Sequence, residues 1–242
     1  MGMLGRGVFS DTEITVERGS PVFFPIHMDV RFKTPFRMQI VGPSLAGKTG
    51  FTFKLLRHSQ DLLDNMPQYI LYFYGEYQPL FTQMSNEIPN ITFIEGIPEN
   101  LNTLIDPTRP GMLIFDDLAS EISDSKFLSN LFTKGSHHKQ LNVVFISQNL
   151  FQQGREMRTI ALNTEYYIIF KNPRDRSQIT HLAKQIHPGN VKFLQDSYVD
   201  ATSEPHTYLL IDLKMSTPEQ IRIRRNIFPN EIHYVYVPRK PL

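Results

Sequence analysis

The feature that most constrains this chain is the segment from Gly42 to Thr49, which reads GPSLAGKT and fits the pattern G-x-x-x-x-G-K-[ST] at every fixed position. A strand-like apolar run, 36–41, precedes the segment, and apolar residues at helical spacing follow from Lys48 to about Leu63. In this context the glycines let successive backbone N–H groups face a phosphate, and the helix start adds the positive end of its dipole. The sequence therefore predicts a phosphate-binding loop.

Two side chains of this loop have predicted roles in nucleotide chemistry. Lys48 is expected to reach the β- and γ-phosphates of ATP and to act in catalysis, and the Thr49 hydroxyl is expected to ligate Mg²⁺. The residues expected to contact the nucleotide are the whole loop and its successor: Gly42, Pro43, Ser44, Leu45, Ala46, Gly47, Lys48, Thr49 and Gly50.

Polar residues follow two further apolar runs, at the points where buried strands would end. Asp116 and Asp117 come directly after the run 112–115, and Ser147 and Gln148 follow the run 143–146. Such strand tips meet a ligand at the carboxyl edge of a parallel sheet. We expect Asp116 to hold Mg²⁺ through water, as a Walker B residue. Many ATPases with a phosphate-binding loop have glutamate at the position of Asp117. Asp117 is expected to polarise the attacking water, and Gln148 to sense the γ-phosphate.

The rest of the chain indicates an α/β fold. Apolar runs alternate with helical or mixed stretches, which favours a mostly parallel central sheet covered by helices on both faces. A final pair of strands is expected near 207–213 and 220–224, joined by a turn at 216–218. We expect a leader with strand character over 1–35 and a single domain over 36–242. Its core spans 36–190, and 191–242 is a C-terminal extension. The other expected strands lie at 69–74, 91–94, 112–115, 142–146 and 166–170, and the helical or mixed stretches near 79–87, 98–106, 123–135, 149–161, 174–187 and 188–198.

Composition excludes several classes of function. The chain has no cysteine, so it holds no disulfide, thiolate zinc site or cysteine nucleophile, and an intracellular location is expected. No apolar run approaches the roughly 20 residues that span a bilayer. The formal net charge of +1 gives no strong global field, so nucleic-acid binding would need local patches or several copies around the strand.

Together these motifs resemble the FtsK/HerA superfamily of DNA-translocating ATPases, above all the genome-packaging ATPases of double-jelly-roll DNA viruses and of Polinton or adintovirus-like elements. The likeness covers roughly 36–190 and rests on 41–49, 115–117, 132–139, 147–150 and 171–176. It implies a RecA-like ASCE sheet, ATP and Mg²⁺ as cofactors, and a homo-oligomeric ring, hexameric or pentameric, around double-stranded DNA. A capsid or portal-vertex partner is also implied, as is a location in the host nucleus or at the site of virion assembly.

One departure from this pattern concerns the arginine that reaches the neighbouring subunit's nucleotide. The matching stretch, 134–139, holds lysines and histidines and no arginine. Lys134 or Lys139 takes this role, or an arginine elsewhere does, and an arginine fork suits the spread charge of a phosphoryl transition state better than a lysine. Arg155 and Arg158 are candidates. We favour Arg174 or Arg176 as catalytic, because they follow a buried strand directly.

Alternative functions stay open on the sequence alone. A P-loop kinase of a small molecule would need an arginine-rich lid, and only scattered arginines are present. An ATP-binding assembly or scaffold factor with slow hydrolysis fits the missing arginine. A GTPase is disfavoured, because 172–175 has proline where the guanine motif needs lysine.

Three further patterns favour structural explanations. His137 and His138 are adjacent, so their side chains point apart and a metal site is not expected. Alternation along 72–74 assigns either Tyr72 and Tyr74 or Phe73 to the core, and Glu76 and Tyr77 are candidates for a position near the nucleotide. The C-terminal basic residues suit a solvated strand face, with a DNA or capsid contact as the alternative: Arg222, Arg224, Arg225, Arg239 and Lys240.

Overall fold

The computed structural model describes residues 29–123, 130–135 and 140–238. The strands are β1 (Arg37–Val41), β2 (Tyr69–Tyr74), β3 (Ile91–Glu95), β4 (Gly111–Asp116), β5 (Leu141–Ser147), β6 (Tyr166–Phe170), β7 (Tyr208–Asp212), β8 (Ile223–Arg225) and β9 (Tyr234–Tyr236). The helices are α1 (Lys48–Arg57), α2 (Ser59–Leu62), α3 (Leu80–Glu87), α4 (Leu101–Leu104), α5 (Ala119–Ser123), α8 (Arg155–Asn163), α9 (Ser177–Ile186) and α10 (Val191–Ala201). Short turns complete the list: the π-helical η1 (Leu131–Gly135) and the 3-10 turns η2 (Pro188–Asn190) and η3 (Glu219–Ile221).

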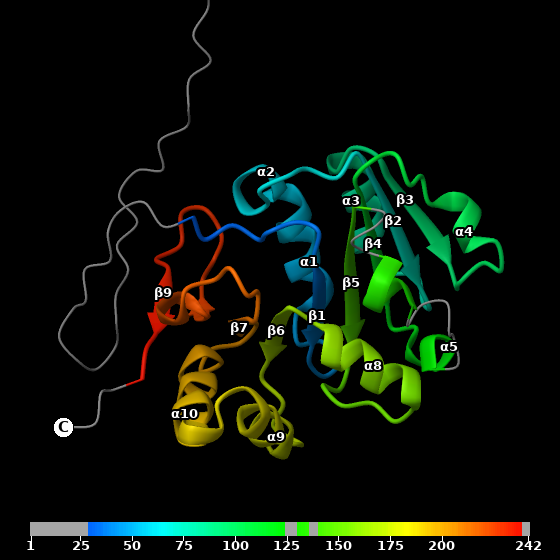
Figure 1. Ribbon diagram of the computed structural model, residues 1–242. Coiled ribbons are helices and arrows are strands. Elements are labelled where there is room, and N and C mark those ends of the chain that lie inside the picture. Colours follow the sequence, from blue (N-terminus) through cyan, green and yellow to red (C-terminus); the bar gives the residue numbers. More distant parts are fainter. Residues whose placement is uncertain (1–28, 124–129, 136–139, 239–242) are drawn as a thin grey trace, which may run out of the picture.

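These strands form one mixed sheet in the order β3-β2-β4-β5-β1-β6-β7-β8-β9 (Figure 1). Every pairing from β3 to β6 is parallel, and every pairing from β6 to β9 is antiparallel. The central strands β1, β4, β5 and β6 are buried at every position, as parallel strands covered on both faces must be. The predicted mostly parallel α/β sheet is therefore confirmed.

Helices cover both faces of the sheet. One face packs against α1, α2 and α3, where Phe51, Leu55 and Phe81 meet alternate residues of the strands. The opposite face carries two apolar clusters, one under α4, α5, η1 and α8 and the other under α9 and α10. Figure 1 shows α9 and α10 side by side beneath β6 and β7.

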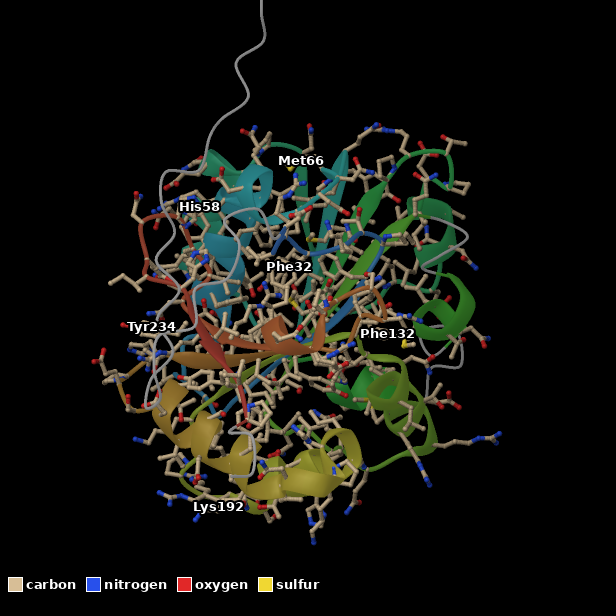
Figure 2. The ribbon with its side chains drawn as sticks, turned by 60° about the vertical axis from the view of Figure 1, so that its left-hand side comes forward. Phe32, His58, Met66, Phe132, Lys192 and Tyr234 are labelled. Atoms are coloured by element: carbon tan, nitrogen blue, oxygen red, sulfur yellow. The ribbon has the colours of Figure 1, made fainter. Side chains whose placement is uncertain are left out.

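The chain before β1 packs into the apolar cluster on the face covered by α1, α2 and α3. Phe32 is 2% exposed and packs edge-on against the ring of Tyr166, at a centroid distance of 4.8 Å. In Figure 2 Phe32 lies at the centre of the molecule, whereas Lys192 on α10 points away from its surface. Residues 1–28 of the predicted leader lie outside the described residues. No helix in the described part of the chain has the length and apolar character that crossing a bilayer requires.

Two details of the C-terminal sheet differ from the predictions. The pair 207–213 and 220–224 does form an antiparallel hairpin-like pair, but the second strand is only Ile223–Arg225, because 219–221 forms a 3-10 turn after Pro218. A third strand, β9, adds to the edge and was not predicted. Three residues are too few for an alternating apolar pattern to be recognised in the sequence.

A buried ionic cluster fixes the amino ends of β1 and β6. Glu165 lies 3.1 Å from the Arg37 guanidinium and 3.0 Å from the Lys214 ammonium, and each of the three side chains is at most 16% exposed. Burial alone would raise the pKa of Glu165, but its bonds to Arg37 and Lys214 outweigh burial and hold that pKa below its ordinary value of 4.5. The ionised carboxylate is thus the form that the fold stabilises.

Replacing this carboxylate is expected to cost stability in a pH-dependent way. Glu165→Gln should lower the free energy of unfolding by about 2 kcal/mol at pH 7, the usual worth of hydrogen bonds to a charged group. A group with a lowered pKa stabilises the fold above its unfolded pKa and loses that effect as pH falls through its folded pKa. Chemical denaturation should therefore show the deficit at pH 7 and a shrinking one below about pH 4.3. The exposed Glu99→Gln is the control, and a deficit that is independent of pH would contradict this account.

Candidate functional site

Residues 42–47 form the turn between β1 and α1 at the carboxyl edge of the sheet, and Lys48 and Thr49 are the first residues of α1. The Gly42 N–H donates to the Ser147 carbonyl at 3.2 Å, so the loop starts beside the tip of β5. All residues of helix α1 belong to the described part of the chain. Its N-cap is Gly47, no side chain caps its first turn, and no acidic residue lies there. Its first N–H groups are therefore not capped by a side chain, which is the arrangement that binds an anion.

Two glycines of the loop are required by its geometry. A Cβ added to Gly42 would lie 2.7 Å from Phe170 Cβ and 3.2 Å from Ala46 Cβ, closer than side chains pack. Gly47 has φ 106°, a backbone region that favours glycine, and a Cβ there would lie 3.1 Å from the His206 ring. Leu45 adopts φ 65° at the loop tip with its side chain 95% exposed.

The Lys48 side chain folds back into the loop. Its ammonium donates to the Gly42 carbonyl at 2.7 Å and to the Pro43 carbonyl at 2.9 Å. An ammonium has three donors, so a phosphate oxygen is able to take the third or replace a carbonyl. Burial lowers the pKa of Lys48, and the carboxylates of Asp116 and Asp117 oppose that shift.

Asp116 ends β4 with its carboxylate directed at Thr49 and is only 4% exposed. Its Oδ2 lies 3.4 Å from the Thr49 hydroxyl and accepts a 2.6 Å hydrogen bond from the Tyr72 hydroxyl. Burial raises the pKa of Asp116, whereas Tyr72 and Lys48 act to lower it. A hydroxyl and a carboxylate beside a phosphate-binding loop are the oxygen donors that Mg²⁺ prefers, so the site fits that ion through Thr49 and Asp116.

Asp117 and Gln148 lie together just beyond the ends of β4 and β5. The Gln148 amide donates to Asp117 Oδ1 at 3.4 Å, and the Asp117 N–H donates to the Ile146 carbonyl at 3.4 Å. Asp117 has φ 56°, and its side chain is exposed at the edge of the sheet. The structure therefore brings Asp117 and Gln148 to the same edge as the loop, Thr49 and Asp116.

The two favoured arginines lie in the loop between β6 and α9, outside this group of contacts. The Asn172 side chain shapes that loop by accepting from the Arg174 N–H at 3.1 Å and the Asp175 N–H at 3.3 Å. Asn172 and Asp175 also line a narrow cleft with Gly42, so the loop borders the start of the phosphate-binding loop. The Arg174 and Arg176 side chains are exposed.

The other cationic candidates are placed only in part. Arg155 and Arg158 are exposed on α8, on the sheet face opposite α1. The backbone of Lys134 belongs to η1, whereas Lys139 and the pair His137 and His138 lie outside the described residues, as do Arg239 and Lys240. Arg224, by contrast, is 5% exposed and pairs with Asp212 at 3.0 Å, so the expected solvated face is wrong for this residue.

Sequence reasoning missed two residues at this edge. Tyr72 was expected only to pack, and its burial is confirmed, but its hydroxyl also contacts Asp116. His206 precedes β7, and its Nδ1 lies 3.2 Å from the Ala46 carbonyl. It borders an open hollow of about 180 Å³ beside the loop tip. No sequence pattern marks either contact, because each joins residues from distant parts of the chain.

Comparison with known proteins shows a fold and no family. No protein-family model and no curated protein matches the sequence. Among solved structures, the genome-packaging NTPase B204 of Sulfolobus turreted icosahedral virus 2 in complex with ATP-gammaS matches with a TM-score of 0.53 at 11% identity, over 78% of this chain and 96% of that one. Its complex with sulfate gives 0.52 at 12%, over 81% and 98%. B204 of Sulfolobus turreted icosahedral virus, a DNA-packaging ATPase, gives 0.53 at 9%, over 78% and 96%.

The fold is thus that of a RecA-like P-loop NTPase, as the family resemblance implies. It is shared with viral NTPases whose structures hold an ATP analogue or sulfate.

The close contact at Gly42 leads to a first prediction for the site. Gly42→Ala should weaken binding of a fluorescent ATP analogue at least tenfold and destabilise the fold by about 1–3 kcal/mol, the usual cost of overpacking. Gly189→Ala in η2 is the matched control, because a Cβ there also meets nothing within 4 Å and the residue lies outside the phosphate-binding loop. It should bind the analogue normally. Normal nucleotide binding by Gly42→Ala would contradict the assigned packing.

Proposed function

We propose that this protein is an ATP-hydrolysing motor of the FtsK/HerA type that translocates double-stranded DNA, with packaging of a viral or mobile-element genome into a capsid as its task. One observation carries the ATPase part of the proposal: Lys48, Thr49, Asp116, Asp117 and Gln148 come from three strand ends and meet at one sheet edge. In this set Lys48 is a cation that binds phosphate, Thr49 and Asp116 are a pair of metal ligands, and Asp117 is a carboxylate hydrogen-bonded to the Gln148 amide.

Each residue has a defined part in hydrolysis. The loop N–H groups and Lys48 hold the phosphates, and Mg²⁺, when bound through Thr49 and Asp116, neutralises charge on the phosphate oxygens. Asp117 accepts the proton of a water aligned for in-line attack on the γ-phosphorus. Gln148, whose amide donates to Asp117, orients that water and senses loss of the γ-phosphate.

DNA translocation and assembly rest on the sequence resemblance and on the shared fold. The B204 proteins are described as genome-packaging NTPases, and they match this chain over nearly their whole length. The narrower likeness to packaging ATPases of Polinton or adintovirus-like elements has sequence support only. A homo-oligomeric ring, a capsid or portal-vertex partner and an intracellular site of assembly are parts of the same proposal.

Nucleotide hydrolysis measured with and without duplex DNA tests the motor. We expect DNA to stimulate ATP hydrolysis by the full chain, and Lys48→Ala and Asp117→Asn each to lower the rate by about 10² or more. Asparagine is the right replacement because it tolerates the positive φ of Asp117. Asp117→Asn should still bind ATP, and Asp196→Asn on α10 should hydrolyse it normally. Phosphorylation of a small molecule without any DNA stimulation would reject the motor and favour a kinase.

Mixing variants tests whether Arg174 or Arg176 acts on a neighbouring subunit. The double variant Arg174→Ala/Arg176→Ala and the variant Asp117→Asn should each be inactive alone. Mixed subunits should regain measurable hydrolysis, because an Asp117→Asn subunit still offers its arginines to a neighbour with an intact Asp117. Lys192→Ala, exposed on α10, should behave as wild type (Figure 2). If mixing restores no activity, the arginines act within their own subunit or not at all.

A further inference from the structure

We infer that Tyr72 is a positioning residue, whose hydroxyl holds the Asp116 carboxylate in the orientation that binds Mg²⁺ together with Thr49. This inference rests on the proposed function, because it assigns a role within the same nucleotide site. It begins with a contact between two strands. Tyr72 of β2 donates to Asp116 Oδ2 at 2.6 Å, and the same oxygen lies 3.4 Å from the Thr49 hydroxyl.

Burial makes this hydrogen bond difficult to replace. Tyr72 is fully buried and Asp116 is 4% exposed, so water does not substitute easily for the hydroxyl. A carboxylate in such surroundings needs each of its donors, because an unsatisfied buried charge is costly. Without the Tyr72 hydroxyl, Asp116 would be free to rotate toward other donors such as the Lys48 ammonium.

The position of the hydroxyl is set by packing. The Tyr72 ring lies against Phe81 of α3 at a centroid distance of 5.1 Å and against Phe93 of β3 at 5.0 Å. Phe81 and Phe93 in turn stack on each other at 4.8 Å. Phe81 and Phe93 hold the Tyr72 ring, and the pairing of β2 with β4 fixes its backbone beside Asp116. The Tyr72 hydroxyl is therefore directed at the Asp116 carboxylate and sets the orientation of that carboxylate.

This arrangement is typical of supporting contacts around metal sites. Carboxylates that ligate metals are commonly hydrogen-bonded by a second residue, and loss of that partner lowers metal affinity by about 10–100-fold. The support here comes from β2 and α3, outside the three motifs that bind nucleotide. The packing of that sheet edge therefore influences metal affinity.

Titration of Mg²⁺ into the full chain with a fluorescent ATP analogue tests this role without measuring hydrolysis. Tyr72→Phe keeps the ring and removes only the hydroxyl. We expect it to raise the half-saturating Mg²⁺ concentration about tenfold, while analogue binding in the absence of Mg²⁺ is unchanged. In an Asp116→Asn background, Tyr72→Phe should have no further effect on that concentration, because the hydroxyl acts through Asp116.

Tyr166→Phe is the matched control. Tyr166 is also fully buried, and its hydroxyl accepts a 3.0 Å bond from the Lys33 N–H, away from the nucleotide site. This variant should lose comparable stability and keep the wild-type Mg²⁺ response. A Tyr72→Phe midpoint within twofold of wild type would overturn the inference. If Tyr72→Phe fails to fold, Phe81→Leu, which loosens the ring but keeps the hydroxyl, replaces it: a raised midpoint supports the role, and an unchanged one overturns it.

The two proposals fail in distinguishable ways. If the wild-type chain binds no ATP analogue at any Mg²⁺ concentration, the nucleotide site itself is wrong. If wild type shows Mg²⁺-dependent binding and Tyr72→Phe shows the same midpoint, the nucleotide site stands and only the role of Tyr72 is rejected.

Discussion

Parallel hydrogen bonding between β1, β4 and β5 is the constraint on which the candidate site depends. Val41 pairs with Ser147 and Asp116 with Ile146, so the three strands end at the same level. The residues just beyond these ends are the phosphate-binding loop, Asp117 and Gln148. A slip of one residue in β4 would turn Asp116 into the opposite face and place an apolar side chain beside Thr49.

Charged groups are buried at both ends of this sheet, with different consequences. At the amino ends Glu165 has two cationic partners, so its charge is balanced within the fold. At the carboxyl ends Asp116 is buried with hydroxyl donors and one nearby cation, and burial raises its pKa. The first cluster is complete without a ligand. The second gains from a cation, which is the physical reason to look for metal binding there.

Much of this structure could be predicted from local patterns. The glycine loop, the apolar strands and the polar residues at their ends are continuous stretches of sequence. The strands β1 to β7 therefore follow from apolar runs that alternate with helical stretches. Parallel pairing of these strands then brings Asp116, Asp117 and Gln148 together. Tyr72 and His206 could not be found in this way. Tyr72 reaches the site from β2 and His206 from the turn before β7. Only packing determines that a core tyrosine also has a polar partner. The burial of Arg224 could not be predicted for the same reason, because its partner Asp212 lies on the neighbouring strand β7.

The backbone conformation at Asp117 links the shape of the turn after β4 to the length of the acidic side chain at this position. At φ 56° the chain favours asparagine, aspartate or glycine and disfavours longer side chains. Many ATPases of the type that the motifs resemble have glutamate at this point, one methylene longer. In this chain the strand-to-helix turn and the length of the acid must change together. Glutamate at this position would be better suited to a turn without this positive φ. Gly75 packs against the same turn, where an added Cβ would lie 3.0 Å from the Asp117 carbonyl oxygen, so the shape of the turn is constrained from that side as well.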